Sequence, residues 1–198
     1  MGIWSRFNRA VVANALAFSI AFGGLKNATA DYMIQTRFED AKENGGVSMK
    51  RLVTFTTFGL FYVGGVQYIV FNRMLPRFLP GLLEGKNIKA AISAAAFDQA
   101  IHMPFMYLPS FYLFRECGLG SGTSLSSIGK NAYNEWTNGF GSDMLASMCV
   151  FIPVQGLNFF FIPPHFRVPL LTSVGFGWVM GLSYFRGKYG NADQGSAE

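Results

Sequence analysis

Apolar residues of this chain are gathered into long runs separated by more polar connections. Each run is close to the length that crosses a hydrocarbon core of about 30 Å as an α-helix. The pattern predicts an all-α integral membrane protein, a single transmembrane domain over residues 1–198 that forms a bundle of four to five helices. The expected membrane segments are residues 11–30, 52–71, 88–114, 144–162 and 168–185.

The last two segments are short, and only residues 163–167 with their Pro163–Pro164 pair separate them. We therefore expect a C-terminal helical hairpin, with five spans if both segments cross completely and four if one is partial. Prolines inside a membrane helix are tolerated and usually kink it, so we expect kinks in the third segment at Pro104 and Pro109. Residues 115–143 are polar and are expected to form a loop.

The composition supports a membrane protein. Hydrophobic residues make up 51% of the chain and charged residues only 14%, whereas a soluble domain carries about 25% charged residues. The net charge is +5, but Lys and Arg lie mostly at segment ends, where they meet lipid headgroups. Membrane lipids are therefore the expected partners, and nucleic acid is not expected. Cys117 and Cys149 are isolated and predict neither a disulfide framework nor a zinc site.

The basic residues do not fix the orientation or the compartment. With five spans, seven Lys and Arg residues lie on one side and eight on the other, so the positive-inside rule gives no orientation. Arg6 and Arg9 precede the first acid, Asp31, which is typical of mitochondrial targeting sequences. Arginines that flank the first membrane segment are the simpler interpretation of the same pattern, and we favour it.

Ionisable groups lie at the end of the first apolar segment and inside the third. Asp31 and Gln35 are four residues apart, so they share one helix face. Asp98 and His102 have the same spacing, with Gln99 beside them. Charges at membrane depth need partners. We therefore expect Asp98 and His102 to approach Asp31 or Lys26.

Two amides lie in the fourth segment. Gln155 and Asn158 are three residues apart, so they also share a face. An amide facing lipid would leave its donors and acceptors unpaired. We expect both amides to face the interior and to hydrogen-bond to another helix or to Arg167.

This polar set has two interpretations. As structural bonds between helices, such groups contribute about 0.6 kcal/mol each on average. As a functional set, they line a hydrated path or a solute site.

The sequence contains no phosphate-binding glycine loop, nucleophile elbow or His-Glu metal motif. We therefore expect no enzymatic activity, no cofactor and no metal. The members of the expected interior polar cluster are Asp31, Gln35, Asp98, Gln99, His102, Gln155, Asn158 and Arg167.

Near the C-terminus, the residues Gln155, Asn158, Phe159, Pro163 and Arg167 form the pattern Q-x-x-N-F-x-x-x-P-x-x-x-R. This pattern resembles the signature of the Mpv17/PMP22 family, small proteins of the mitochondrial inner membrane and the peroxisome. Further matches to the family occur in order along most of the chain: Trp4, Asp31, Gln35, Arg51, Gly59, Gly64, Asp98, Gln99, Pro104, Trp178, Leu182 and Ser183.

The resemblance implies a weakly selective pore for small solutes or ions in the mitochondrial inner membrane or, alternatively, in the peroxisomal membrane. The chain departs from the family in its second segment, where the pattern G-P-x-x-H-x-W-Y is replaced by residues 64–71, GGVQYIVF. This departure favours a second hypothesis, an accessory subunit of a larger mitochondrial membrane complex that has no transport activity.

Overall fold

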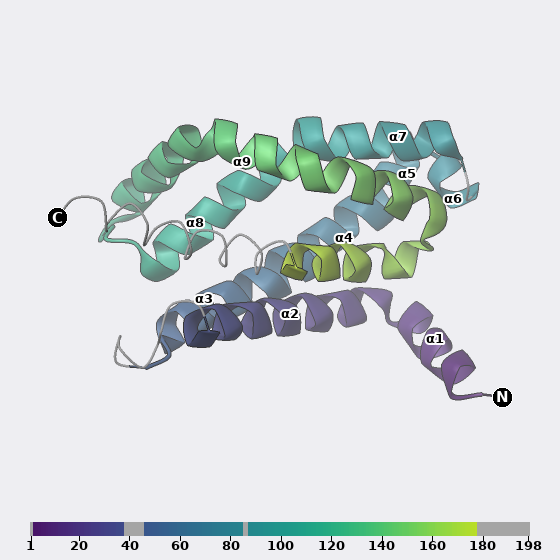
Figure 1. Ribbon diagram of the computed structural model, residues 1–198, viewed down its shortest axis with the longest axis horizontal. Helices are drawn as coiled ribbons and strands as arrows, with labels where there is room; N and C mark the ends of the chain where they lie inside the picture. Colours follow the sequence, from purple (N-terminus) through teal and green to yellow (C-terminus); the bar gives the residue numbers. More distant parts are fainter. Residues whose placement is uncertain (1, 38–45, 85–86, 178–198) are drawn as a thin grey trace.

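The computed structural model describes residues 2–37, 46–84 and 87–177, apart from the side chains of Ile3, Trp4 and Glu84. These residues form helices and short connections, with no strand among them. Figure 1 shows the helices running back and forth along the long axis of the molecule, with α1 turned away at one end. The prediction of an all-α bundle is therefore confirmed.

A sharp turn separates the first two helices, α1 and α2. Helix α1 (Ile3–Ala13) ends at Asn14, and α2 (Ala15–Arg37) follows at an angle of 97°. After residues 38–48, one continuous helix runs from Met49 to Phe78. It consists of α3 (Met49–Phe58), the π-helical stretch η1 (Gly59–Val66), α4 (Gln67–Ile69), the π-helical stretch η2 (Val70–Met74) and α5 (Leu75–Phe78). Ser48 caps its start by accepting a hydrogen bond from the Arg51 amide.

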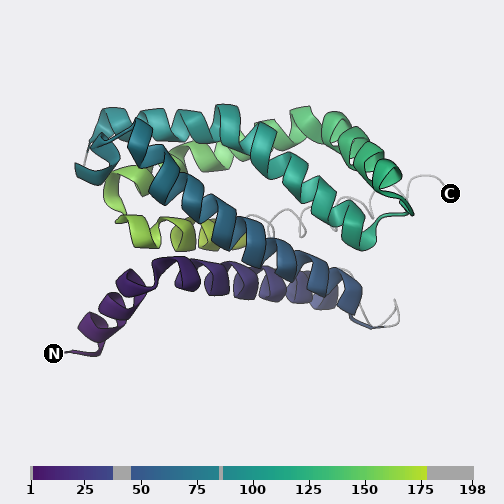
Figure 2. The ribbon, with the colours of Figure 1, turned by 180° about the vertical axis from the view of Figure 1, so that it is seen from behind.

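The second half of the bundle is also formed by long helices that run in alternating directions. Residues 79–87 contain the short α6 (Gly81–Glu84). A long helix then follows, consisting of α7 (Ile88–Phe97), the π-helical stretch η3 (Asp98–Tyr107) and α8 (Leu108–Leu119). Helix α9 (Leu125–Phe161) returns beside it, and a last helix begins at 164 and reaches 177, where the described residues end. Figure 2 shows the Met49–Phe78 helix crossing the bundle diagonally.

The prolines of the third segment do not interrupt its helix, and the expected kinks at Pro104 and Pro109 stay predictions. Residues 88–119 remain helical throughout, and Pro104 lies inside η3. Proline has no N–H to donate, so a regular α-helix would lack one bond there. The wider π-helical turns of η3 accommodate this change, and Pro109 lies in the first turn of α8, where a missing N–H is harmless. This π-helical stretch presents Asp98, Gln99 and His102.

The polar loop expected over residues 115–143 is also wrong over most of its length. Helix α8 continues to Leu119, and α9 begins at Leu125 with Ser124 as its N-cap. Ser124 and Ser127 form a reciprocal capping box, in which each side chain bonds the other residue's backbone N–H. The polarity of this sequence reflects an exposed amphipathic helix and not a loop.

Two helices are long and apolar enough to cross a membrane: Met49–Phe78 and Leu125–Phe161. The bent pair of α1 and α2 makes a third if it forms one span. These counts apply to the described residues. The fifth expected segment, residues 168–185, lies partly outside them, so the choice between four and five spans stays a prediction.

Helix α2 packs closely against η1, and glycines on both helices make this contact possible. A Cβ atom on Gly23 would lie 2.6 Å from the carbonyl oxygen of Gly59, and one on Gly59 would lie 2.5 Å from the Gly23 carbonyl oxygen. A Cβ atom on Gly64 would overlap the backbone of Ile20. Small residues allow membrane helices to approach in this way.

We expect Gly64→Ala to destabilise the bundle by about 1–3 kcal/mol, because the added methyl group would force α2 and η1 apart. Thermal unfolding in detergent measures the effect. Gly156→Ala in α9 is the control, since a Cβ atom there meets nothing within 4 Å. Equal melting temperatures for the Gly64 variant and the wild type would contradict the close contact.

Candidate functional site

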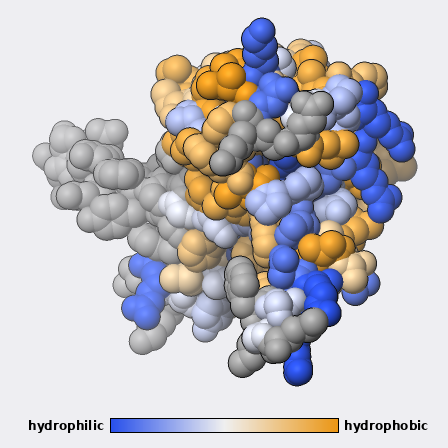
Figure 3. Space-filling model, turned by 90° about the vertical axis from the view of Figure 1, so that its right-hand side faces the viewer, coloured by the Kyte–Doolittle hydropathy of each residue, from blue (hydrophilic) through white to orange (hydrophobic). Residues whose placement is uncertain are grey.

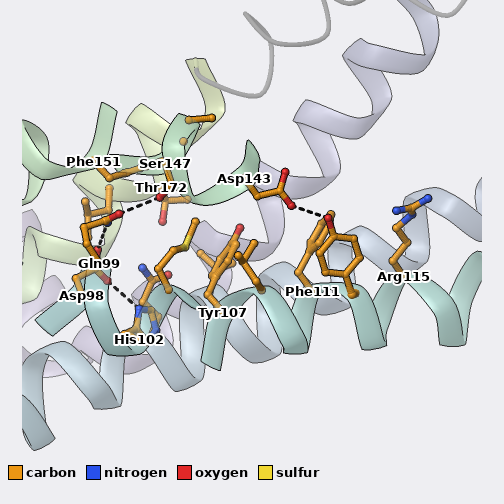
Figure 4. Close-up of a pocket in the computed structure, with 18 of the residues that line it drawn as sticks. Asp98, Gln99, His102, Tyr107, Phe111, Arg115, Asp143, Ser147, Phe151 and Thr172 are labelled. Carbon is orange, nitrogen blue, oxygen red and sulfur yellow. Dashed lines mark hydrogen bonds and ion pairs between the residues drawn. The ribbon is translucent and has the colours of Figure 1, made fainter. Parts of the chain in front are cut away.

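A cavity of about 840 Å³ lies between the helices. Its lining comes from α2, the Met49–Phe78 helix, η3, α8, α9 and the last helix. Asp98, His102 and Gln155 line its inner part, and Arg115 and Asp143 lie toward the other end, as Figure 4 shows for the residues it labels. The Arg115 side chain is 44% exposed, so the cavity reaches the surface there.

The inner end of the cavity contains a hydrogen-bonded polar group, which we call the Asp98 cluster: Tyr62, Asp98, Gln99, His102 and Ser147. One Asp98 oxygen lies 2.8 Å from His102 Nδ1, and the other accepts from Gln99 Nε2 at 2.8 Å. The Ser147 hydroxyl donates to Gln99 Oε1 at 3.1 Å, and Tyr62 OH lies 3.3 Å from His102 Nε2. The cluster therefore joins η3 to both η1 and α9.

All five members of the Asp98 cluster are buried. A carboxylate at this depth needs charge compensation or hydrogen bonds, and Asp98 has both when His102 is protonated. The expected shared helix face of Asp98 and His102 is confirmed by their direct bond. The sequence reasoning missed Tyr62 and Ser147, which belong to other helices and carry no distinguishing spacing.

Charged residues near the outer part of the cavity are paired. The Tyr112 hydroxyl donates to Asp143 Oδ2 at 2.6 Å, and Arg115 Nη1 lies 3.0 Å from Glu135 Oε2. Lys26 also lines the cavity, and its ammonium donates to Asn27 Oδ1 at 3.1 Å. Among the described residues, no three His, Cys, Asp or Glu side chains gather closely enough to hold a metal ion.

The expected single cluster that would also include Asp31 and Gln35 is wrong. Asp31 Oδ1 accepts from Arg51 Nε at 2.7 Å, and Asp31 Oδ2 accepts from Gln35 Nε2 at 2.8 Å. The amide N–H of Ser48 donates to Gln35 Oε1 at 2.6 Å. These contacts join the end of α2 to the start of α3. Neither Asp31 nor Gln35 is among the residues that line the cavity.

Gln155 and Asn158 are buried, 1% and 0% exposed, as the sequence predicts. Their expected partners are wrong. Asn158 Nδ2 donates to Gln155 Oε1 at 3.3 Å within α9, and Asn158 Oδ1 has no partner among the described residues. Gln155 lines the cavity next to the Asp98 cluster, whereas Asn158 lies one turn farther along α9, outside the lining.

Arg167 is 2% exposed and bonds to backbone carbonyls instead of amide side chains. Its Nη2 donates to the Leu82 oxygen at 2.8 Å and its Nε to the Ile162 oxygen at 3.1 Å. The guanidinium also lies over the Phe159 ring, 5.4 Å from its centroid. Burial lowers the pKa of Arg167 to about 10, so it remains charged at neutral pH. Arg167 thus ties the turn after α9 to the connection before α7.

An apolar cluster closes the inner end of the cavity. We call it the apolar plug; it includes Val70, Phe71, Leu75, Ala94, Phe159 and Val168. Along each long helix, the cavity lining ends where the plug begins: at Gln67 before Val70, at Gln155 before Phe159, and at Asp98 after Ala94. The Phe71 ring lies edge-on to His102, with 5.0 Å between centroids. Among the described residues the cavity is therefore closed on this side.

The residues that match the family signature lie in several different parts of the structure. Arg51 pairs with Asp31, Gly59 and Gly64 contact α2, and Phe159 belongs to the plug. Pro104 is buried in η3, and Pro163 follows the end of α9. The side chain of Trp4 and all of Trp178, Leu182 and Ser183 lie outside the described residues.

The helices and the buried ionisable cluster define an α-helical membrane protein with a polar internal cavity. Residues 124–183 match the family model described as the Mpv17 / PMP22 family. The chain is also similar to the mitochondrial inner membrane protein Mpv17 of Xenopus laevis, with 24% identity over 187 residues, which cover 92% of this chain and 96% of that relative. No solved structure matches the chain.

Together, these findings support the assignment of the chain to the Mpv17/PMP22 family. The matched region 124–183 contains α9, the turn with Arg167 and the last described helix. It therefore supplies one wall of the cavity and part of the apolar plug.

We expect Arg51→Gln to destabilise the protein by about 2 kcal/mol, because it removes the Arg51 guanidinium from the buried Asp31 carboxylate. The effect is smaller than for a fully buried pair, since the Arg51 side chain is 25% exposed. Chemical or thermal unfolding in detergent measures it. Lys50→Gln is the matched control: it removes a neighbouring exposed charge and should leave the stability unchanged.

Proposed function

We propose that this chain is an inner-membrane protein of mitochondria that conducts small polar solutes or ions through its internal cavity and catalyses no reaction. The observation that carries the proposal is the cavity of about 840 Å³ that leads from Arg115 to the buried Asp98 cluster. Bonds between helices need no cavity beside them, whereas here the costly buried groups of the Asp98 cluster line an internal space. The similarity to the mitochondrial inner membrane protein Mpv17 supports the location.

The lining can replace water around a permeating solute. Gln99, His102 and Gln155 offer amide and imidazole groups, and Asp98 offers a carboxylate. Tyr107 of η3 and Ser147 of α9 add hydroxyl groups to the lining from two helices, visible in Figure 4. Conduction requires such replacement bonds along the whole path. The lining supplies them from Arg115 inward to the Asp98 cluster.

The apolar plug sets the condition for conduction. A constriction lined by apolar side chains blocks ions by dewetting. Phe71 and Phe159 face each other at right angles with centroids 5.4 Å apart, directly behind His102. We propose that the described conformation is closed and that conduction requires the plug to part.

The accessory-subunit hypothesis stands as the second candidate, favoured by the sealed inner end of the cavity. A subunit without transport activity would keep the bundle and have no need for an open path. It predicts no conductance from the purified chain and co-migration with a large native complex. Planar-bilayer recording and native electrophoresis of mitochondrial membranes therefore distinguish the two.

We expect Asp98→Asn to lower the cation-to-anion permeability ratio severalfold, because it removes the carboxylate at the inner end of the cavity and keeps the side-chain volume. Reversal potentials in an asymmetric salt gradient measure this ratio. Asp143→Asn is the matched control, since Asp143 lies near the exposed end, where water and salt screen its charge. An unchanged ratio in Asp98→Asn would remove Asp98 from the conduction path.

We expect Phe71→Ser to raise the conductance of the resting protein, because a small hydroxyl group lets water enter the plug. Phe71→Leu should stay closed, since the plug stays apolar. Phe61→Ser on the same helix is the control, because Phe61 is 63% exposed on the outer surface. Circular dichroism and a single elution peak verify folding of each variant. No conductance in any variant would favour the accessory-subunit hypothesis.

A further inference from the structure

The two ends of the bundle differ in charge. One end consists of α1, the connection that holds α6 and the turn after α9; we call it the α1 end, and it appears on the right of Figure 1. The described residues within 1–14, 72–90 and 162–168 supply six Lys and Arg residues to this end but a single acid, Glu84. The described residues within 31–51 and 115–143, at the opposite end, supply five Lys and Arg residues and four acids. The two ends carry similar numbers of basic residues, so their difference in net charge arises mainly from the acids.

The cations of the α1 end are accessible. Arg6, Arg9, Arg73, Arg77 and Lys89 are all exposed. Figure 3, which views the molecule from this side, shows strongly hydrophilic residues around the rim of the face and apolar residues between them. Arg167 is the exception, because it is buried and bonded to backbone carbonyls.

Helix α1 is amphipathic and is turned away from α2 at the end of the bundle. Ser5, Arg6 and Arg9 are exposed, whereas Val11 is 3% exposed and Phe7 packs edge-on against Phe18 with centroids 6.0 Å apart. At 100° per residue, Phe7 and Val11 fall on one side of the helix and Ser5 and Arg9 on the other. The 97° bend at Asn14 turns α1 almost perpendicular to α2.

Helix α1 is also held in this position. Asn8 Oδ1 lies 3.2 Å from His165 Nε2 in the turn after α9. The contact joins residues that are far apart in sequence, so the orientation of α1 belongs to the packed bundle. A helix perpendicular to a membrane-spanning bundle lies parallel to the membrane plane.

We propose that the α1 end binds the anionic phospholipids of one membrane leaflet, with α1 lying in the headgroup layer. Phe7 points toward the acyl chains, and Arg6 and Arg9 contact lipid phosphates together with Arg73, Arg77 and Lys89. A basic amphipathic helix is typical of such interfacial binding. The excess of cations over acids at this end complements an anionic leaflet, and the balanced opposite end has no such preference. The proposal does not depend on conduction.

The first experiment titrates the full-length chain in detergent with phosphatidylglycerol or phosphatidylcholine and counts bound lipids by native mass spectrometry. We expect the wild type to prefer phosphatidylglycerol. The double variant Arg6→Gln/Arg9→Gln should lose roughly 10- to 30-fold in affinity for this lipid, since each basic residue near an anionic surface contributes about a fivefold factor.

The matched control removes the same charge from the opposite end, as Lys50→Gln/Lys130→Gln, and should bind phosphatidylglycerol like the wild type. Equal losses in both double variants would show that total charge alone governs binding, and would overturn the proposal. Equal affinities for the two lipids in the wild type would overturn it as well.

The second experiment tests the depth of α1 in vesicles that contain phosphatidylglycerol. In a Cys117→Ser/Cys149→Ser background, Ser5→Cys should react with a water-soluble maleimide, and Phe7→Cys should be protected. Reaction at both positions would place α1 in water, and protection of both would place it inside the membrane. Either outcome contradicts an interfacial helix.

Discussion

A polar group in the hydrocarbon layer needs a partner inside the protein, because an unpaired one costs several kcal/mol. This constraint organises the structure. Asp31 is paired with Arg51 and Gln35, which fixes the end of α2 against the start of α3. Asp98 is paired with His102 and Gln99, and their further bonds reach η1 and α9. The Arg167 guanidinium joins two connections through their carbonyl groups. Each polar contact thus joins segments that apolar packing alone would leave free to slide.

The long helices enclose a polar cavity over one part of their length and a packed apolar cluster over the next. Around Asp98 the helices enclose a polar cavity, and around Phe71 they enclose a packed apolar plug. The glycines of α2 and η1 bring those two helices into backbone contact, while α8 and α9 line the cavity toward Arg115 and Asp143. Stretches with i→i+5 bonding are frequent at functional sites. Here η3 supplies Asp98, Gln99 and His102 to the boundary between the two interiors.

The similarity to the Mpv17/PMP22 family agrees with this division. The matched region provides the wall of the cavity that carries Gln155 and the part of the plug that carries Phe159. The replaced residues of the second segment, 64–71, lie where the cavity gives way to the plug. This stretch includes Gln67 of the lining and Val70 and Phe71 of the plug, whereas the paired residues Asp31, Arg51 and Asp98 lie outside it.

The sequence by itself determined the membrane class, the helical bundle and the polar residues that are buried. Long apolar runs and the high cost of a lipid-facing amide are sufficient for these conclusions, and Gln155 and Asn158 are buried accordingly. The spacing of Asp98 and His102 also sufficed, since residues four apart meet on any helix. Partners from other helices were decided only by the tertiary structure. Register and rotation between helices place Arg51, and not Lys26, on Asp31, and they bring Tyr62 and Ser147 to the Asp98 cluster. No local pattern encodes these contacts, because they depend on how closely glycine-containing faces allow neighbouring helices to approach.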